Sequence, residues 1–217
     1  AYLSDYDTIE VIFKSGEVDI KEIKDSIMDL AGLEILEQTS TRLVAKDLID
    51  MSGISINSMI RRMDIITRSM IEDTIKCAEG VCKYTDIAQR DLDVNRLHFL
   101  AYRVIRKALC NPRIAKFIKR DPWQLQADKS TVMRLEKIAD RQKRIARYFV
   151  DTKLIKEELA KLHDIHRDCY KAYLDVMRAY YTNDAALAYQ VEMSHKDRIK
   201  KCTDFLIDHT HCDILSL

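Results

Sequence analysis

The first fifty residues of the chain switch between an alternating and a helical pattern of apolar positions. Every second residue of TIEVIFK (8–14) is apolar, which is typical of a half-buried strand. Isoleucine and leucine then recur at helical spacing in residues 20–30, and Gly32 is expected to end that helix. The apolar runs LEILE (33–37) and RLVAK (42–46) are joined by QTST and predict a hairpin. The pattern therefore predicts a small β-α-β-β module over residues 1–50.

From residue 51 onward the apolar residues step by three and four, as they do along helices. The expected inward positions are Ile56, Met59, Met63, Ile66 and Met70; Val94, Leu97, Ala101, Val104 and Ala108; Leu135, Ile138, Ala139, Ile145 and Phe149; Leu162, Cys169, Tyr173, Val176 and Tyr180; and Ala188, Val191, Cys202 and Phe205. Asp121-Pro122 and Asn183-Asp184 mark helix starts. Long helices joined by short polar links predict an antiparallel up-down helical bundle over residues 51–217.

Composition agrees with a mainly α protein. Only 4 Gly and 2 Pro occur in 217 residues, too few turns for a sandwich or barrel. Hydrophobic residues make up 47% and charged residues 33%, which is the balance of a folded chain. No apolar run approaches the ~20 residues of a membrane span, and no signal peptide opens the chain. Because the chain does not begin with Met, we expect the native protein to extend upstream.

The charges are distributed unevenly between the two expected modules. Residues 1–50 carry 12 acids and 5 bases, a net of −7, and residues 51–217 carry 23 acids and 31 bases, a net of +8. Their unlike charge and the exposed strand edges expected in the first module predict a homodimer, formed by edge pairing or by charge-complementary docking between two chains. The first module is small for a core of its own, so it is also expected to lean on the helices or on a second copy.

Paired carboxylates on the expected helices are the candidate metal ligands. Glu136 and Asp140 lie at i and i+4 within RLEKIADRQKRIARY (134–148), and so share one helix face. Paired carboxylates from more than one helix bind hard or borderline cations such as iron. The best partners are Asp91 and Asp93 in QRDLDVNRL (89–97), in which Asn95 repeats the same spacing. The alternative is that these residues form a solvated or salt-bridged helix edge.

Other motifs give little support for an enzyme. Glu192 and His195 form one E-x-x-H unit, but a di-iron bundle needs two such units and two further Glu. The pairs His163 with His166 and His209 with His211 lack a complete zinc ligand set. There is no glycine-rich phosphate loop and no G-x-S-x-G sequence. The sequence therefore favours a protein without catalytic activity.

The six cysteines are scattered and never form C-x2-C; they are Cys77, Cys82, Cys110, Cys169, Cys202 and Cys212. In a chain of this length without a secretory signal they are expected to be free thiols in a reducing cytoplasm. Cys169 and Cys202 fall on apolar stripes, where cysteine usually acts as a small hydrophobic residue.

A basic stretch, RKALCNPRIAKFIKR (106–120), interrupts the helical pattern. It could dock on phosphates or on an acidic partner, or it could be a solvated face balanced by the acidic first module. Phe117 and Trp123 are the only aromatic residues nearby, so nucleic-acid recognition by base stacking is not indicated.

Four segments together resemble the PhoU family of phosphate-uptake regulators, in particular its archaeal branch. They are LAGLEILEQTSTRLVAKDLID (30–50), INSMIRRMDIITRSMIEDTI (56–75), QRDLDVNRLHFLAYRVIRKAL (89–109) and RLEKIADRQKRIA (134–146). The last resembles the L-E-R-I-A-D-H-A-x-x-I-A signature of the family. The order and spacing of all four segments carry the resemblance, which extends over nearly the whole chain.

The resemblance implies a PhoU-like bundle that binds an iron or zinc cluster through E(D)-x-x-x-D motifs. Glu136 and Asp140 match one motif, and Asp91 matches the first position of another, in which Asn95 replaces the expected Asp. Arg141 replaces the familiar His, and Lys196 stands where the motif that begins at Glu192 should end. The chain also ends after five expected long helices, whereas six-helix members continue.

The resemblance further implies a cytoplasmic, non-enzymatic regulator that links phosphate-transporter activity to gene expression through protein–protein contacts. Its partners would be the phosphate ABC transporter and the associated sensor kinase. Many archaeal relatives carry an AbrB-like DNA-binding domain ahead of this region, and this chain begins where such a domain would end. The alternative function is therefore the effector and dimerisation region of an archaeal AbrB-type transcriptional regulator, which would contact DNA only through that upstream domain.

Overall fold

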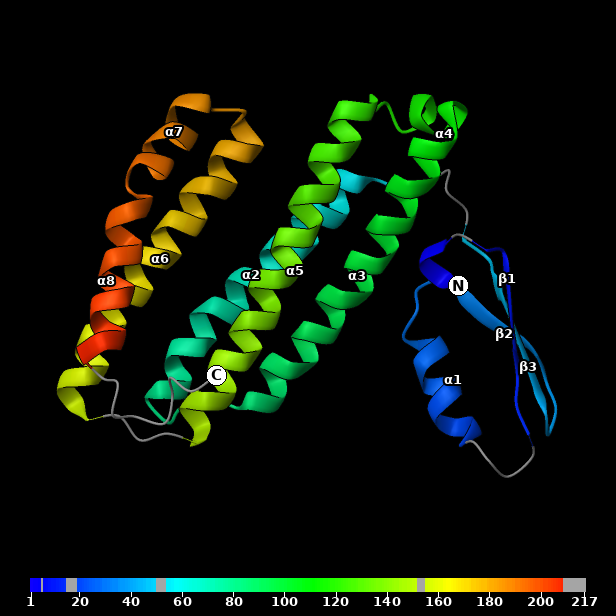
Figure 1. Cartoon of the computed structure of the whole chain (residues 1–217), viewed down its shortest axis with the longest axis horizontal. Coiled ribbons are helices and arrows are strands. Elements are labelled where there is room, and N and C mark those ends of the chain that lie inside the picture. The colour runs from blue at the N-terminus through cyan, green and yellow to red at the C-terminus, as the bar shows by residue number, and fades with distance from the viewer. Residues whose placement is uncertain (5, 15–18, 50–53, 152–154, 209–217) are drawn as a thin grey trace. The chain divides into compact units, whose positions relative to one another are not determined.

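The computed structural model describes residues 1–4, 6–14, 19–49, 54–151 and 155–208. The described chain is mainly helical with a small antiparallel sheet (Figure 1). It divides into two compact units. The first unit contains Ala1–Thr67 and Gln89–Ala139, and the second contains Arg68–Ala88 and Asp140–Leu217. The domain boundary predicted between residues 50 and 51 lies outside the described residues and stays a prediction.

The first unit begins with the predicted β-α-β-β module. A short 3-10 helix, η1 (Tyr2–Ser4), leads into β1 (Thr8–Ile12), α1 (Ile20–Met28), β2 (Leu33–Gln38) and β3 (Arg42–Asp47). The sheet order is β1-β3-β2 and both pairings are antiparallel, so β3 is central and β2 and β3 form the predicted hairpin. The position of Gly32 is the one correction. Helix α1 ends at Met28 with Asp29 as its C-cap, and Gly32 (φ +80°) forms the turn before β2.

The core of this module is completed by residues outside the strands. Its buried cluster consists of Tyr2, Ile27, Leu33, Leu43 and Ala45. Phe99, a residue of helix α3 (Tyr84–Cys110), packs against that cluster. The module therefore leans on a helix of its own chain, as its small size predicted.

Ionic contacts also attach the module to α3. The guanidinium of Arg103, which is fully buried, donates to the Asp47 carboxylate at the end of β3 over 2.5 Å. The same guanidinium lies 4.2 Å from the centroid of the Tyr2 ring. Lys107 Nζ lies 3.5 Å from Asp47, and Arg96 pairs with Asp29. Part of the charge complementarity between the acidic module and the basic helices is thus satisfied within one chain.

The predicted seams of the first long helices are confirmed. Helix α2 (Ile56–Ala78) buries Ile56, Met59, Met63 and Met70, with Ile66 half-buried. In α3, every predicted inward position, from Val94 to Ala108, is buried. The short α4 (Pro112–Phe117) follows, and α5 (Pro122–Asp151) begins at the predicted Asp121-Pro122 site. In α5, Leu135 and Ala139 are buried as predicted.

The predicted faces of the later helices need correction. In α5, Ile145 is exposed and Ala146 is buried in its place. In α6 (Lys156–Thr182), the predicted Cys169, Val176 and Tyr180 are exposed, while Met177 and Ala179 are buried. Each buried position lies one residue away from a predicted one.

The predicted fifth long helix is two helices, α7 (Ala185–Met193) and α8 (His195–Asp208). Asn183 adopts a left-handed conformation (φ 53°) and ends α6, and Asp184 caps α7 by accepting from the Leu187 amide. Ala188 is exposed, whereas Val191, Cys202 and Phe205 are half-buried. The contacts Asp168–Lys201 and Lys161–Asp208 show that α8 runs antiparallel to α6.

The cysteines depart from the expected free thiols. Cys77 and Cys82, both in the second unit, form a disulfide, while Cys110, Cys169 and Cys202 are free thiols. Cys212 lies outside the described residues. Because disulfides are rare in a reducing cytoplasm, the predicted cytoplasmic location gains no support from the structure. In the described part of the chain, none of the helices combines the length and the apolar character needed to cross a membrane.

Candidate protein-binding surface and the predicted metal ligands

The four predicted metal ligands each contact a polar neighbour. Asp91 on α3 is buried and accepts from the Asn95 amide over 3.4 Å. Asp93, on the same helix, lies 3.9 Å from Arg96. Glu136 lies 3.9 Å from the His98 ring, and Asp140 lies 3.1 Å from Lys143 Nζ. Burial lowers the pKa of His98, which favours a neutral ring and weakens its attraction for Glu136.

The contacts of these four residues differ from those of ligands that bind a metal cluster together. Among the described residues, no group of three or more His, Cys, Asp or Glu side chains lies close enough to hold a metal ion. Asp93 and Asp140 instead have cationic neighbours three residues along their own helices, as the salt-bridged alternative predicted. The iron or zinc cluster implied by the PhoU resemblance thus gains no support from the described residues, and it stays a prediction.

We expect the melting temperature of the purified chain to be unchanged by a molar excess of Fe2+, Zn2+ or Mn2+. A metal bound only to the folded state would stabilise it by roughly 2.7 kcal/mol at a hundredfold excess over its dissociation constant, and would visibly raise that temperature. The measurement is a set of melting curves with elemental analysis, for the parent and for Glu136→Ala. If metal raised the melting temperature of the parent but not that of Glu136→Ala, the result would contradict this expectation and support the metal cluster.

The other candidate ligands have structural partners in the second unit. His166 contacts the Ile71 carbonyl oxygen at 2.9 Å, and His163 lies 3.2 Å from Glu79. The E-x-x-H unit is divided, because α7 ends before Ser194 and His195 begins α8. His209 and His211 lie outside the described residues.

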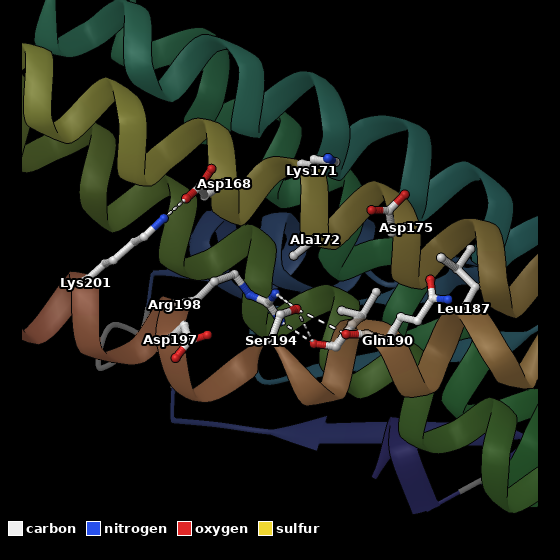
Figure 2. Close-up of a pocket in the computed structure, with 11 residues that line it drawn as sticks. Asp168, Lys171, Ala172, Asp175, Leu187, Gln190, Ser194, Asp197, Arg198 and Lys201 are labelled. Atoms are coloured by element: carbon white, nitrogen blue, oxygen red, sulfur yellow. Dashed lines mark hydrogen bonds and ion pairs between the residues drawn. The ribbon is translucent and has the colours of Figure 1, made fainter.

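A polar cleft of about 390 Å³ lies between α6, α7 and α8 (Figure 2). It is lined by the carboxylates of Asp168, Asp175 and Asp197 and by the cations of Lys171, Arg198 and Lys201. Lys201 pairs with Asp168, and Arg198 donates to Ser194 and to the Val191 carbonyl. The opposite charges balance, so the cleft has no clear preference for an anion or a cation.

The corner between α4 and α5 presents a different kind of surface. Phe117 is 59% exposed and Trp123 is 82% exposed. Arg113, Lys116 and Lys119 are exposed beside them in the sequence, and none has an ion-pair partner within the described ranges. We call these five residues the basic-aromatic corner. Exposed aromatic side chains and arginine are typical of protein-binding surfaces, and the lysines add positive charge that favours an acidic partner.

The backbone of this corner is held in place by its own sequence. The Asn111 side chain caps α4 by accepting from the Arg113 amide over 3.0 Å, and Pro112 occupies the first turn. At the start of α5, Asp121 and Gln124 exchange side chain–backbone hydrogen bonds of 2.7 and 3.0 Å. The exposed side chains therefore extend from ordered helix ends.

Arg120 anchors the linker between the two helices. Its guanidinium donates to the Asp128 carboxylate over 2.9 Å and to the side chain of Asn57 on α2. Lys119, the preceding residue, has a left-handed backbone (φ 54°), and its side chain is exposed. Adjacent basic residues thus have opposite roles, since Arg120 stabilises the fold and Lys119 remains available.

Sequence reasoning identified the basic stretch 106–120 but could not divide it. Arg106 donates to the Leu3 carbonyl, Lys107 approaches Asp47, and Arg120 pairs with Asp128, so these three stabilise the first unit. Only tertiary contacts distinguish them from the exposed cations of the corner. The sequence did offer one signal, the aromatic pair of Phe117 within the stretch and Trp123 just after it.

Comparison of the chain with protein-family models, curated proteins and solved structures found no match in any of the three.

Proposed function

We propose that this chain is a regulatory adaptor of phosphate uptake, which acts by docking an acidic protein surface on its basic-aromatic corner. The observation that carries the adaptor role is the corner itself, where Phe117 and Trp123 are exposed beside cations that form no ion pair with the described part of the chain. Binding energy at protein interfaces concentrates in such aromatic and arginine side chains. The phosphate part of the proposal rests on the resemblance to the PhoU family.

The distribution of the resembling segments supports the proposal. Residues 30–50 include β2 and β3, and residues 56–75, 89–109 and 134–146 lie within α2, α3 and α5 respectively. Each helical segment falls inside one uninterrupted long helix, as a PhoU-like bundle would require. The partners proposed on this basis are the phosphate ABC transporter and its sensor kinase, contacted by a homodimer of this chain.

Deletion of the gene in its native host tests the proposal. We expect the deletion strain to take up labelled phosphate faster than the parent strain in phosphate-rich medium, because the restraint on the transporter is lost. Complementation with the gene should restore the parental rate. Uptake that is the same in the deletion, complemented and parent strains would contradict the proposal.

A second candidate function is the effector region of a transcriptional regulator. The observation in its favour is that α3 holds the start of the chain, since Arg103 lies over the Tyr2 ring and Arg106 binds the Leu3 carbonyl. A structural change in α3 would therefore be transmitted through Tyr2 and Leu3 to any domain that precedes residue 1. Transcript levels of the transporter genes separate the two functions. Loss of a transcriptional regulator changes those levels directly, whereas loss of an adaptor changes phosphate uptake before the transcript levels respond.

A further inference from the structure

Two free thiols lie near each other on neighbouring helices of the second unit. Cys169 belongs to α6 and Cys202 to α8, and Cys202 is close enough to Cys169 to raise its pKa. The residue before each cysteine takes part in a contact, in which Lys201 Nζ donates to Asp168 over 2.5 Å (Figure 2). Two consecutive residues of α6 thus face two consecutive residues of α8. The antiparallel packing of α6 and α8 therefore places the two thiols near each other.

The two thiols differ in their access to solvent. Cys169 is exposed, whereas Cys202 is only partly accessible. A small oxidant can therefore reach Cys169 first, and Cys202 is already beside it. An accessible thiol beside a second thiol that can react with it is one feature of redox-sensitive cysteines; their other feature, a low pKa, is absent at Cys169.

We propose that Cys169 and Cys202 are a modification site at which a hydroperoxide links α6 to α8 through a disulfide. The Cys169 thiolate attacks one oxygen of the peroxide, the O–O bond breaks, and the products are a sulfenic acid and, for hydrogen peroxide, water after protonation. The Cys202 sulfur then loses its proton and attacks the Cys169 sulfur, the S–O bond breaks, and a second water leaves. Two thiols are oxidised by two electrons, and one hydrogen peroxide is reduced to two waters.

The surroundings of the thiols indicate a slow, stoichiometric reaction. Although part of the Cys169 side chain is exposed, packing around the thiol desolvates it and raises its pKa; the neighbouring Cys202 and Asp168 act in the same direction, while Arg198 opposes them. Because the thiolate is the attacking species, its small fraction at neutral pH slows the first step, and a higher pH accelerates it. The pair is therefore suited to recording an oxidant and not to removing it catalytically.

The test uses the full chain with Cys212→Ser as background, so that a cysteine outside the described residues cannot exchange. After hydrogen peroxide treatment, free thiols are alkylated and the digest is analysed by mass spectrometry without reduction. We expect a new Cys169–Cys202 cross-link and an intact mass lower by two hydrogens. The melting temperature should rise by more than about 5 °C and return after reduction, since the cross-link closes a long loop.

Matched variants identify the roles of the two thiols. In Cys202→Ser, Cys169 has no neighbouring thiol, and its sulfenic acid should persist and be trapped by dimedone. Cys110→Ser should behave as the parent does, because Cys110 lies in the first unit. Retained melting of the untreated variants confirms that they fold. The proposal is overturned if peroxide links Cys169 to another cysteine or to a second chain, or if Cys202 reacts as fast after Cys169→Ser as before.

Discussion

Replacement of Arg103 by Ala is expected to lower the free energy of unfolding by about 3–5 kcal/mol, the usual effect of breaking a buried ion pair. The Arg103 side chain is 0% exposed and that of Asp47 is 4% exposed, so the substitution leaves a carboxylate away from water. It also removes the guanidinium from the face of the Tyr2 ring, which belongs to the core of the module. Urea denaturation of the parent and the variant measures the loss.

Two further variants separate charge from packing. Arg96→Ala breaks an ion pair in which the Arg96 side chain is 43% exposed and the Asp29 side chain is 52% exposed. It should lower the free energy of unfolding by less than about 1 kcal/mol. The double variant Asp47→Ala with Arg103→Met removes both charges and should recover much of the loss, because no buried charge remains unpaired. If Arg103→Ala cost no more than Arg96→Ala, the attachment of the module to α3 would not depend on this pair.

The same pair makes stability depend on pH. Burial alone would raise the pKa of Asp47, but hydrogen bonds from Arg103 and the Ile49 amide, with the charges of Arg103 and Lys107, lower it below its usual value of 3.8. The folded state therefore binds this proton less readily than the unfolded state does. The contribution of Asp47 to the free energy of unfolding is complete above the pKa of Asp47 in the unfolded chain. It is lost as the pH falls through the lower pKa of Asp47 in the folded chain. Arg103→Ala should flatten this part of the stability curve.

Loss of Trp123 from the basic-aromatic corner is expected to weaken binding of an acidic partner by at least about tenfold. An interface residue of this kind contributes roughly 2 kcal/mol or more when it is buried by a partner, and Trp123 is 82% exposed in the free chain. Charge reversal of Lys116 and Lys119 should weaken binding more at low salt than at high salt. Salt screens exposed charges, and the Debye length falls from about 10 Å at 0.1 M to about 3 Å at 1 M. Isothermal titration with the purified partner at several salt concentrations measures both effects.

The second unit offers matched controls for this prediction. Tyr189 is 65% exposed on α7, and Lys200 is exposed on α8. Tyr189→Ala and Lys200→Glu change an exposed aromatic and an exposed cation away from the corner, and they should leave the affinity within about twofold. Equal losses from the corner variants and from these controls would show that general surface charge, and not the corner, binds the partner.

The parts of the fold that follow from local pattern could be predicted from the sequence. The alternation in 8–14 identifies the half-buried face of β1, and the steps of three and four along α2 and α3 identify faces that the structure buries. The split between α7 and α8 could not be predicted, because Ser194 is neither Gly nor Pro. Its hydroxyl bonds back to the Gln190 and Val191 carbonyls, and that contact is visible only in the folded chain.

The candidate site was less predictable than the fold. The spacing of Glu136 and Asp140 is the same for a ligand pair and for a salt-bridged edge, and only the neighbouring side chains distinguish the two. Arg103 belongs to a helix rich in basic residues, and nothing local to it indicates the long-range pairing with Asp47. The free cations of the corner could be identified only after the structure had assigned partners to Arg106, Lys107 and Arg120.

The rate of phosphate uptake in the deletion strain complemented with corner variants shows directly whether the corner regulates uptake. We expect the chain with Trp123→Ala, Lys116→Glu and Lys119→Glu to be present at parental levels but to leave uptake as fast as in the deletion strain. The chain with Tyr189→Ala and Lys200→Glu should restore the parental rate. Full restoration by the corner variant would contradict the claim that this chain regulates phosphate uptake through the basic-aromatic corner.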